Sequence, residues 1–541
     1  MTNPIHAVQE HGQSIWYDMI SRDLVRSGEL ARMVEQDGIL GVTSNPALFE
    51  KAIGGSSDYD EQLRELVEQQ GIGEPVCLFE ALAIADIQQG CDVLRGVHDR
   101  TGGVDGYVSL EVSPYLANDT EGTIEEARRL WAAVDRKNLM IKVPATPEGI
   151  PAVATLIGEG INVNVTLLFA VEAYAAVADA YVEGLERFAA SGGDVSTVSS
   201  VASFFVSRID AVVDGQLASR LESETDPAVR AKLEGLQSKI AIANAVMAYA
   251  HFDSVVASDR WQALAKQGAL PQRVLWASTG TKSPSLPRTL YVDALIGQHT
   301  VNTIPAATLE AFRTEGTVRD ALGEDKEAAV AEARGILATL DELGISLKEI
   351  TDDLLPKGCQ LFCDAFDTLL GTVAERRAGV LGPRLAQLDA KLGSSAEGVE
   401  RELDQWRARG YVRRLWAQDA SLWSSGDEAS WLGWLGALEH AAPLADDFAK
   451  IAERARSEDI RHVVVMGMGG SSLCPDVLSR TFGAARGYPE LIVLDSTVPS
   501  QLAAVEARIE LAHSLFIVPS KSGGTIEPNS FKAYFWDRVE T

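Results

Sequence analysis

Short apolar runs alternate with helix-like segments through the first 310 or so residues of the chain. Each run ends in small polar residues, and the segments between them, such as 124–137 and 171–190, repeat apolar residues at intervals of three and four. This alternation predicts parallel strands joined by amphipathic helices. The eight predicted strands span residues 14–18, 38–45, 106–114, 139–144, 161–169, 197–205, 273–279 and 300–305.

Eight strand–helix units within about 300 residues favour an α/β protein with a (β/α)8 TIM barrel, although a doubly wound sheet shares much of this pattern. Residues 319–376 predict two further helices that pack outside the barrel. We therefore assign residues 1–376 to a barrel domain.

A second pattern begins after residue 376. Residues 377–409 contain Gly, Ser and Pro and are predicted to form a linker, and a helical stretch follows to about residue 458. Its Trp-rich part, 413–436, has helical spacing, so we expect these tryptophans in a core. Three more strand–loop–helix units then predict a second α/β domain over 410–541. Three strands are few for such a domain, so we expect it to be incomplete.

The amino-acid composition limits the kinds of partner that the protein is expected to bind. The formal net charge of −29 argues against nucleic-acid binding, which needs clustered Lys and Arg, but it leaves room for a small anionic substrate at a local positive site. Five cysteines without zinc-type spacing predict neither a metal site nor a disulfide framework. No signal-like segment or membrane-length apolar run is evident, so we expect a cytoplasmic protein with no membrane partner. The oligomeric state is not predicted.

The most unusual position is Lys142, which lies inside the apolar run LMIKVP. A buried ammonium is costly, and desolvation lowers the pKa of a lysine until the neutral amine can attack a ketone. In a barrel the carboxyl ends of all strands meet at one mouth. A polar residue at any one strand end also has a simpler interpretation, in which it faces water and has no catalytic role. The polar residues near these ends include Asp18, Asn45, Glu111, Asn164, Thr166, Ser203 and, farther on, Arg208 and Lys282.

The motifs GVTSNPALFEKAI, VSLEVSP, MIKVPATPEGIPA, INVNVTLLF and WASTGTKSP, in this order, resemble the transaldolase family over about residues 10–370. The resemblance implies that Lys142 is the Schiff-base lysine and that Asp18 is the general acid/base at the cleaved bond. It implies that Glu111 and Thr166 position the catalytic water. The implied substrate contacts are Asn45, Asn164 and Ser203 for the dihydroxyacetone part and Arg208 for the phosphate.

One motif departs from the family. Many transaldolases carry a second phosphate arginine after the seventh strand, where this chain has STGTKSP, and we assign that task to Lys282. Glu111 argues against the related fructose-6-phosphate aldolases, which resemble this barrel but carry a tyrosine at that position.

The resemblance implies transfer of a dihydroxyacetone unit from sedoheptulose 7-phosphate to glyceraldehyde 3-phosphate, a step of the pentose phosphate pathway that needs no cofactor. The products are erythrose 4-phosphate and fructose 6-phosphate. Two alternatives stay open: a Schiff-base fructose-6-phosphate aldolase that releases free dihydroxyacetone, and a non-catalytic protein that binds sugar phosphates.

The second domain carries two glycine-rich turns, GMGGSS and SKSGGTIE, each after an apolar strand. Free backbone amides and hydroxyls at such turns suit a phosphate. The pair resembles the first sugar-phosphate-binding (SIS) sandwich subdomain of glucose-6-phosphate isomerase. That family's catalytic glutamate and histidine lie beyond this subdomain, so we expect a fused protein, ended early, without isomerase activity. The implied contacts are Gly470, Ser471, Ser520, Lys521, Ser522 and Thr525.

Overall fold

The computed structural model of the chain describes residues 3–281, 283–382 and 391–540. These residues form two compact units, Met1–Arg413 and Arg414–Thr541. The segment predicted as a linker contains the helix α18 (Ala396–Ala408), which belongs to the first unit and contacts the long helix α17 (Leu347–Leu381).

Eight parallel strands close into a barrel in the first unit. Each strand pairs with its neighbours in chain order, and β8 pairs back with β1, where Thr303 lies opposite Trp16. This closure confirms the predicted TIM barrel and rules out the doubly wound alternative, whose sheet is open. The strands are β1 (Gln13–Asp18), β2 (Gly41–Thr43), β3 (Val108–Glu111), β4 (Leu139–Pro144), β5 (Val163–Leu168), β6 (Ser200–Phe205), β7 (Arg273–Ala277) and β8 (Thr300–Ile304).

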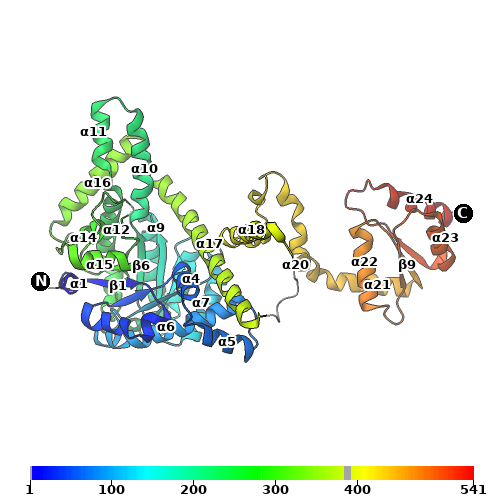
Figure 1. Cartoon of the computed structure of the whole chain (residues 1–541), viewed down its shortest axis with the longest axis horizontal. Helices are drawn as coiled ribbons and strands as arrows, with labels where there is room; N and C mark the ends of the chain where they lie inside the picture. The colour runs from blue at the N-terminus through cyan, green and yellow to red at the C-terminus, as the bar shows by residue number, and fades with distance from the viewer. Residues whose placement is uncertain (1–2, 282, 383–390, 541) are drawn as a thin grey trace. The chain divides into compact units, whose positions relative to one another are not determined.

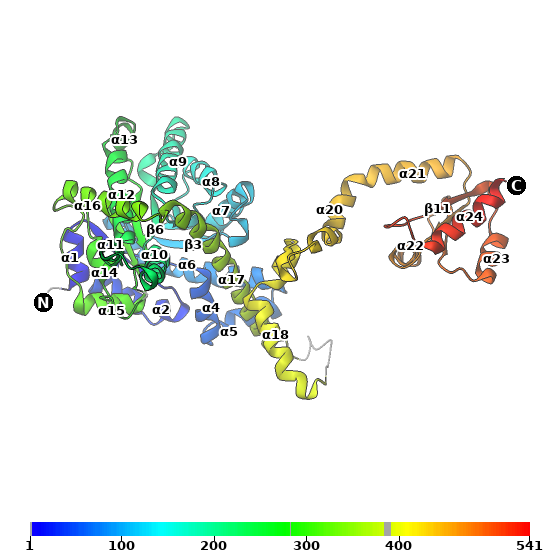
Figure 2. The same cartoon turned by 90° about the horizontal axis from the view of Figure 1, so that it is seen from above.

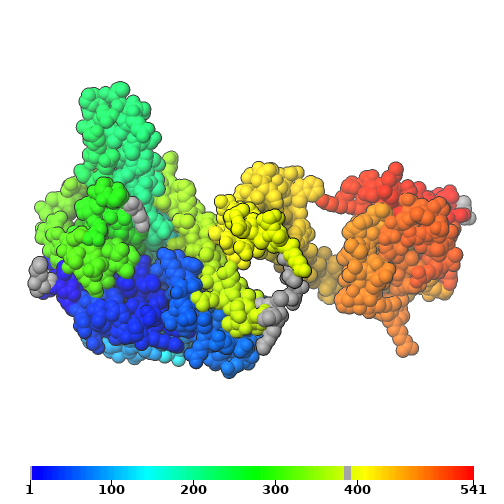
Figure 3. Space-filling model, viewed as in Figure 1, coloured from blue at the N-terminus to red at the C-terminus, as the bar shows by residue number. Residues whose placement is uncertain are grey.

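Helices form the outer layer of this unit and surround the strands in two perpendicular views (Figure 1, Figure 2). In the space-filling view the α10–α11 region stands out from the surface of the unit (Figure 3). The helices before α17 are α1 (Pro4–Glu10), α2 (Arg22–Arg26), α3 (Glu29–Arg32), α4 (Pro46–Gly55), α5 (Asp60–Glu68), α6 (Pro75–Arg100), α7 (Thr120–Val134), α8 (Gly149–Gly158), α9 (Val171–Ala190), α10 (Ser207–Ser223), α11 (Pro227–Leu236), α12 (Ile240–Ala257), α13 (Asp259–Ala265), α14 (Leu290–Ala294), α15 (Ala306–Glu315) and α16 (Lys326–Glu342).

Local signals explain where these helices begin and end. The predicted helix 171–190 matches α9, whereas the predicted helix 124–137 is shifted toward the N-terminus in α7. Asp119 caps α7 by accepting a hydrogen bond from the Gly122 amide at 3.0 Å, and Asp135 ends it in the left-handed region with φ of 49°. The two helices predicted over 319–376 are α16 and α17, and α17 continues to Leu381.

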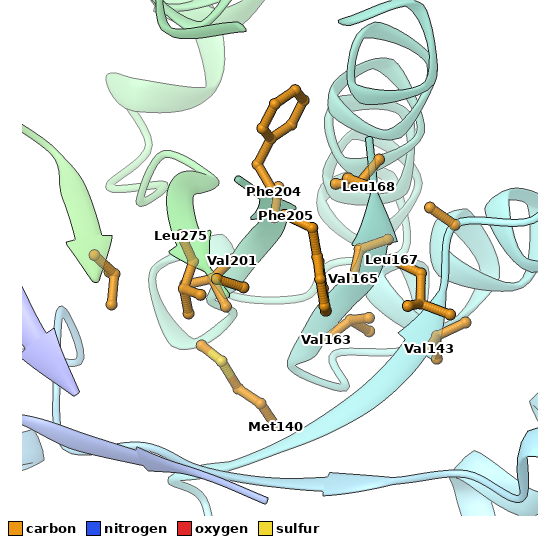
Figure 4. Close-up of a cluster of buried hydrophobic side chains, with 14 of the residues drawn as sticks. Met140, Val143, Val163, Val165, Leu167, Leu168, Val201, Phe204, Phe205 and Leu275 are labelled. Atoms are coloured by element: carbon orange, nitrogen blue, oxygen red, sulfur yellow. The ribbon is translucent and has the colours of Figure 1, made fainter. Parts of the chain in front are cut away.

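A continuous apolar core lies between the strands and the helices. Ile141 and Val143 of β4 and Val163 and Val165 of β5 are fully buried. Figure 4 shows part of this core, where buried side chains of neighbouring strands from β4 to β7 gather. Burial of each such side chain stabilises the fold by about 1.5–3 kcal/mol.

Asp105 holds the amino-terminal end of the barrel together. Its carboxylate accepts hydrogen bonds from Ser14 Oγ at 2.7 Å, from Trp16 Nε1 at 3.0 Å and from Arg273 Nη2 at 2.9 Å. These residues come from the start of β1, the start of β7 and the loop before β3. A buried charge is tolerated only when it is paired in this way, so Asp105 fixes the end of the barrel opposite the mouth.

Among the described residues, α12 is the one helix long and apolar enough to cross a membrane, with a mean hydropathy of 1.4. It contacts α9, α10, α16 and β7 on the outside of the barrel. Core helices of barrels share this composition.

The second unit contains a three-stranded parallel sheet in the order β10-β9-β11. The predicted strands are confirmed as β9 (His462–Met466), β10 (Glu490–Leu494) and β11 (Ser514–Ile517). Val464, Met466 and Leu494 form a small core with Phe531 and Phe535. The boundary between the two units falls within α19 (Tyr411–Trp416). The helices of the second unit are α20 (Ala437–Ala441), α21 (Ala445–Ser457), α22 (Gly470–Phe482), α23 (Pro499–Arg508) and α24 (Ile526–Glu540).

The prediction that the tryptophans of 413–436 lie in a core is wrong. Trp416, Trp423, Trp431 and Trp434 are each more than half exposed. Short 3-10 turns at Ala420–Leu422, Glu428–Trp431 and Gly433–Gly436 replace a continuous helix, so helical spacing does not bring these rings to one face.

The Asp105 cluster makes a testable prediction about stability. Asp105→Ala leaves the Arg273 guanidinium buried without its carboxylate, so we expect the free energy of unfolding to fall by about 3–5 kcal/mol in a urea titration. The matched control is Asp99→Ala, which removes a half-exposed carboxylate paired with Arg95 and Lys137 and should change stability by less than about 1 kcal/mol. Equal losses in both variants would contradict the assigned role of Asp105.

Candidate active site

A cavity of about 440 Å³ opens at the carboxyl ends of the barrel strands. It brings together six of the residues predicted from the sequence, and helix α17 supplies Leu361, Phe362 and Ala365 to its wall. The predicted residues that line it are Asp18, Asn45, Lys142, Thr166, Ser203 and Arg208.

Lys142 lies on β4 with only 6% of its surface exposed. Its Nζ is 3.3 Å from Glu111 Oε1, donates a hydrogen bond to the Ser44 carbonyl oxygen at 3.1 Å, and lies 5.6 Å from the centre of the Phe362 ring. These contacts hold the lysine inside the mouth, so its side chain does not extend to the surface. The chain turns sharply after β4, where a Cβ on Gly149 would lie 2.0 Å from the Pro144 carbonyl oxygen.

Glu111 is the direct neighbour of Lys142 in the sheet, because β3 and β4 pair in a register that places these two residues side by side. Burial raises the pKa of Glu111 to about 7, although the nearby Lys142 opposes this rise. Within the described part of the chain, Glu111 Oε2 and Thr166 Oγ1 are buried and have no hydrogen-bond partner. Buried polar atoms of this kind are the places where a water or a substrate atom gains most from binding.

Asp18 occupies the end of β1. Its Oδ1 accepts a hydrogen bond from Thr43 Oγ1 at 2.7 Å, and Thr43 in turn lies 2.6 Å from Thr303 Oγ1. Burial raises the pKa of the Asp18 carboxyl, and the Thr43 hydrogen bond and the charge of Lys142 oppose that rise. A carboxyl whose pKa is raised holds a proton more readily than an exposed aspartate does, which suits a group that accepts and returns a proton.

Three amide and hydroxyl residues take different positions around this pair. Asn164, which pairs with Lys142 in the sheet, is fully buried. Its Oδ1 accepts from Ser203 Oγ at 2.7 Å and its Nδ2 donates to Ser109 Oγ at 3.0 Å. Asn45 caps α4, accepting from the Leu48 amide at 3.1 Å, and lines the cavity with Ser203.

Arg208 enters the cavity from the first turn of α10, directly after β6. Its guanidinium lies 5.1 Å from the centre of the Phe205 ring, and burial lowers its pKa without removing its charge. No carboxylate of the described residues forms an ion pair with it. Arg208 therefore brings into the cavity a positive charge that an anionic group can bind, on a strongly acidic protein. Lys282, the other predicted phosphate contact, lies outside the described residues.

Sequence reasoning missed several contributors to this site. Thr43 and Ser44 directly precede Asn45 in the motif GVTSN. Their place at the end of a predicted strand is the sequence signal that could have identified them. Leu361 and Phe362 carried no such signal, because their helix α17 reaches the mouth from about 200 residues farther along the chain. Within the described residues, no group of three or more His, Cys, Asp or Glu side chains is arranged to hold a metal ion.

The predicted residues of the second unit lie on two loops that follow β9 and β11. Gly470 and Ser471 begin α22, and Ser520 Oγ accepts a hydrogen bond from the Gly523 amide at 3.0 Å. Ser522 Oγ lies 3.4 Å from Thr525 Oγ1. The Lys521 Nζ lies 3.9 Å from the centre of the Trp431 ring. Because β9 and β11 are parallel neighbours, both loops leave the same edge of the sheet.

Comparison with known proteins assigns the barrel to a family. The family described as Transaldolase/Fructose-6-phosphate aldolase matches residues 15–373. A protein named Transaldolase from Frankia alni is 48% identical over 385 residues, which are 71% of this chain and 100% of that relative. A relative of the same name from Thermobifida fusca is 47% identical over 70% of this chain and 99% of that relative. Another from Trichodesmium erythraeum is 44% identical over 70% of this chain and 98% of that relative. The chain belongs to the transaldolase/fructose-6-phosphate aldolase family.

Proposed function

We propose that the barrel is a transaldolase, an enzyme that moves a dihydroxyacetone unit from a ketose phosphate to an aldose phosphate through an imine on Lys142. The donor is sedoheptulose 7-phosphate and the acceptor glyceraldehyde 3-phosphate, which places the reaction in the pentose phosphate pathway. The observation that carries this proposal is the buried Lys142 amine, 3.3 Å from the Glu111 carboxylate at the barrel mouth. Relatives named Transaldolase support it at 44–48% identity.

The first step is imine formation. The neutral Lys142 amine attacks the ketone carbon of the donor, and the resulting carbinolamine loses water to give the imine. Glu111 takes the ammonium proton from Lys142 and supplies a proton to the departing hydroxyl. A carboxyl whose pKa is about 7 can do both at neutral pH. The free atoms Glu111 Oε2 and Thr166 Oγ1 hold that water and return it when the product imine is hydrolysed.

The second step breaks a carbon–carbon bond. Asp18 accepts the proton of the substrate hydroxyl, the bond between that carbinol carbon and its neighbour breaks, and the electron pair moves into the protonated imine to give an enamine. An aldose phosphate leaves, and the enamine attacks the aldehyde carbon of the acceptor. Asp18 then returns its proton to the new hydroxyl. The Thr43 hydrogen bond orients Asp18 for both transfers.

Polar groups around the cavity hold the substrate in place. Asn45, Asn164 and Ser203 contact the dihydroxyacetone part, and the unpaired Arg208 binds the phosphate with the help of Lys282. An arginine held against an aromatic ring suits a dianionic group, because its fork can donate to two oxygens.

For residues 410–541 we propose a domain related to the sugar-phosphate-binding subdomain of glucose-6-phosphate isomerase. The two glycine-rich loops at one sheet edge support this assignment, and the sugar phosphate would contact Gly470, Ser471, Ser520, Lys521, Ser522 and Thr525. Lys521 lies over the exposed ring of Trp431, so a phosphate that draws the ammonium away changes the environment of that ring.

The imine gives the sharpest test. Borohydride reduction in the presence of fructose 6-phosphate should leave a covalent adduct on Lys142, detected by mass spectrometry of peptides. Lys142→Ala should lose both the adduct and turnover. The control Lys137→Ala changes a half-exposed lysine before the same strand and should keep both. Absence of an adduct from the wild-type chain would contradict catalysis and leave a protein that only binds sugar phosphates.

Acceptor dependence separates a transaldolase from an aldolase. With fructose 6-phosphate as donor, we expect consumption only when erythrose 4-phosphate is also present. Free dihydroxyacetone formed at a similar rate without the acceptor would assign the barrel to the aldolase branch of the family.

Glu111 predicts a dependence of stability on pH. Its pKa is raised from 4.5 to about 7, so the folded state binds a proton that the unfolded state has lost, and this stabilisation disappears as pH rises through about 7. The melting temperature of Glu111→Gln relative to wild type should therefore rise between pH 4.5 and pH 8, while kcat falls roughly a hundredfold. The exposed control Glu121→Gln on α7 should show neither effect. A pH-independent difference in melting temperature would refute the burial argument.

The second domain is testable by tryptophan fluorescence. In a Lys142→Ala background, fructose 6-phosphate should change the emission of Trp431, and the change should disappear in Trp431→Phe and weaken in Lys521→Ala. Lys532→Ala, on the exposed side of α24, is the control. An unchanged signal in the parent chain at millimolar ligand would oppose a sugar-phosphate site there.

A further inference from the structure

The loop that carries Glu111 is held against helix α17. After Glu111, the Pro114 carbonyl oxygen accepts from Cys363 Sγ at 3.5 Å, and the Tyr115 ring meets the Phe366 ring edge-on at a centroid distance of 5.3 Å. Cys363 and Phe366 both belong to α17. The same helix presents Phe362 to Lys142. The position of α17 therefore affects both members of the Lys142–Glu111 pair.

Arg413 joins this loop and this helix. Its Nε lies 3.0 Å from Asp367 Oδ2 and its Nη2 lies 3.1 Å from Asp364 Oδ1, both on α17. Its guanidinium lies 5.6 Å from the centre of the Tyr115 ring, and the Tyr115 hydroxyl donates to Asp367 Oδ1. One cation therefore pairs with two carboxylates and lies over the ring of the loop that leads from Glu111.

The backbone before Arg413 is shaped for this contact. Gly410 has a φ of +58°, and a Cβ at this position would lie 1.8 Å from Asp367 Oδ2. A side chain there would collide with the carboxylate that Arg413 binds, so the glycine permits the close approach. Asp367 is only 11% exposed and the Arg413 side chain 21%, so removing either residue leaves the other charge largely buried without this partner.

Arg413 lies 40 residues beyond residue 373, the last position matched by the family. It follows α18, a second anchor of the same segment, where Arg407 pairs with Glu375 of α17 at 2.7 Å. The segment between α17 and the second unit thus contacts the back of the helix that lines the active-site cavity.

We propose that Arg413 is a positioning residue for the transaldolase reaction, which acts through Asp367 and Tyr115 to hold α17 and the Glu111 loop in their catalytic positions. This proposal rests on the proposed function of the barrel. It gives the segment after the barrel a role in catalysis, because that segment supplies a contact to the loop of Glu111 that lies outside the region matched by the family.

Steady-state kinetics with fructose 6-phosphate and erythrose 4-phosphate test the proposal. Arg413→Ala should lower kcat about tenfold or more with KM for the donor changed less than about twofold, since small misplacements of reacting groups cost up to about a hundredfold in rate. The rate at which the borohydride-trapped adduct forms on Lys142 should fall in parallel. Arg413→Lys, which keeps a cation between the two carboxylates, should recover part of the loss.

Arg407→Ala is the matched control, because it removes another ion pair between the same segment and α17 without touching the Tyr115 loop. It should lower the melting temperature less than Arg413→Ala does, because the Arg407–Glu375 pair is more exposed, and it should leave kcat unchanged. Equal effects of the two variants on kcat, or a normal kcat in Arg413→Ala, would overturn the proposal. If Arg413→Ala is not recovered folded, Tyr115→Phe, which removes only the hydroxyl bound to Asp367, decides by the same readouts. A wild-type chain that forms no adduct would instead reject the proposed function itself.

Discussion

Closure of the barrel between β1 and β8 is the constraint on which the rest of the structure depends. Closure of a barrel fixes the total stagger of its strands. The register observed here places Glu111, Lys142 and Asn164 side by side on β3, β4 and β5. At the opposite end, Asp105 connects the beginnings of β1 and β7 through buried hydrogen bonds. Backbone pairing thus sets the positions of these three residues at the mouth.

Charge is distributed unevenly over this protein, and that distribution suits an anionic substrate. The chain carries a formal net charge of −29, yet its cavity contains a lysine and an arginine. Lys142 has a partner in Glu111, whereas Arg208 has no carboxylate partner among the described residues. Burial of Asp18 and Glu111 raises both of their pKa values. Shifts of this kind are typical of residues at functional sites, where they are accepted at a cost in stability.

Residues beyond the region matched by the family pack against the barrel unit and do more than link it to the second unit. Helix α18 and Arg413 contact the outer side of α17, whose inner side lines the cavity with Leu361 and Phe362. The second unit has its own small core around β9 and leaves several tryptophans exposed.

The sequence by itself determined the barrel and most of the residues that gather in its mouth. Periodicity placed all eight strands within a few residues, because parallel strands buried on both faces form distinct apolar runs. Strand ends identified Lys142, Glu111 and Asp18, since topology alone brings such ends together. Only the tertiary structure decided how Asn164 uses its hydrogen bonds, that Phe362 faces Lys142, and that Gly410 and Arg413 approach Asp367. These contacts join residues far apart in the chain through side-chain packing, which leaves no periodic pattern in the sequence. The exposed tryptophans show the same limit: helical spacing predicts one face only where the backbone forms a continuous helix.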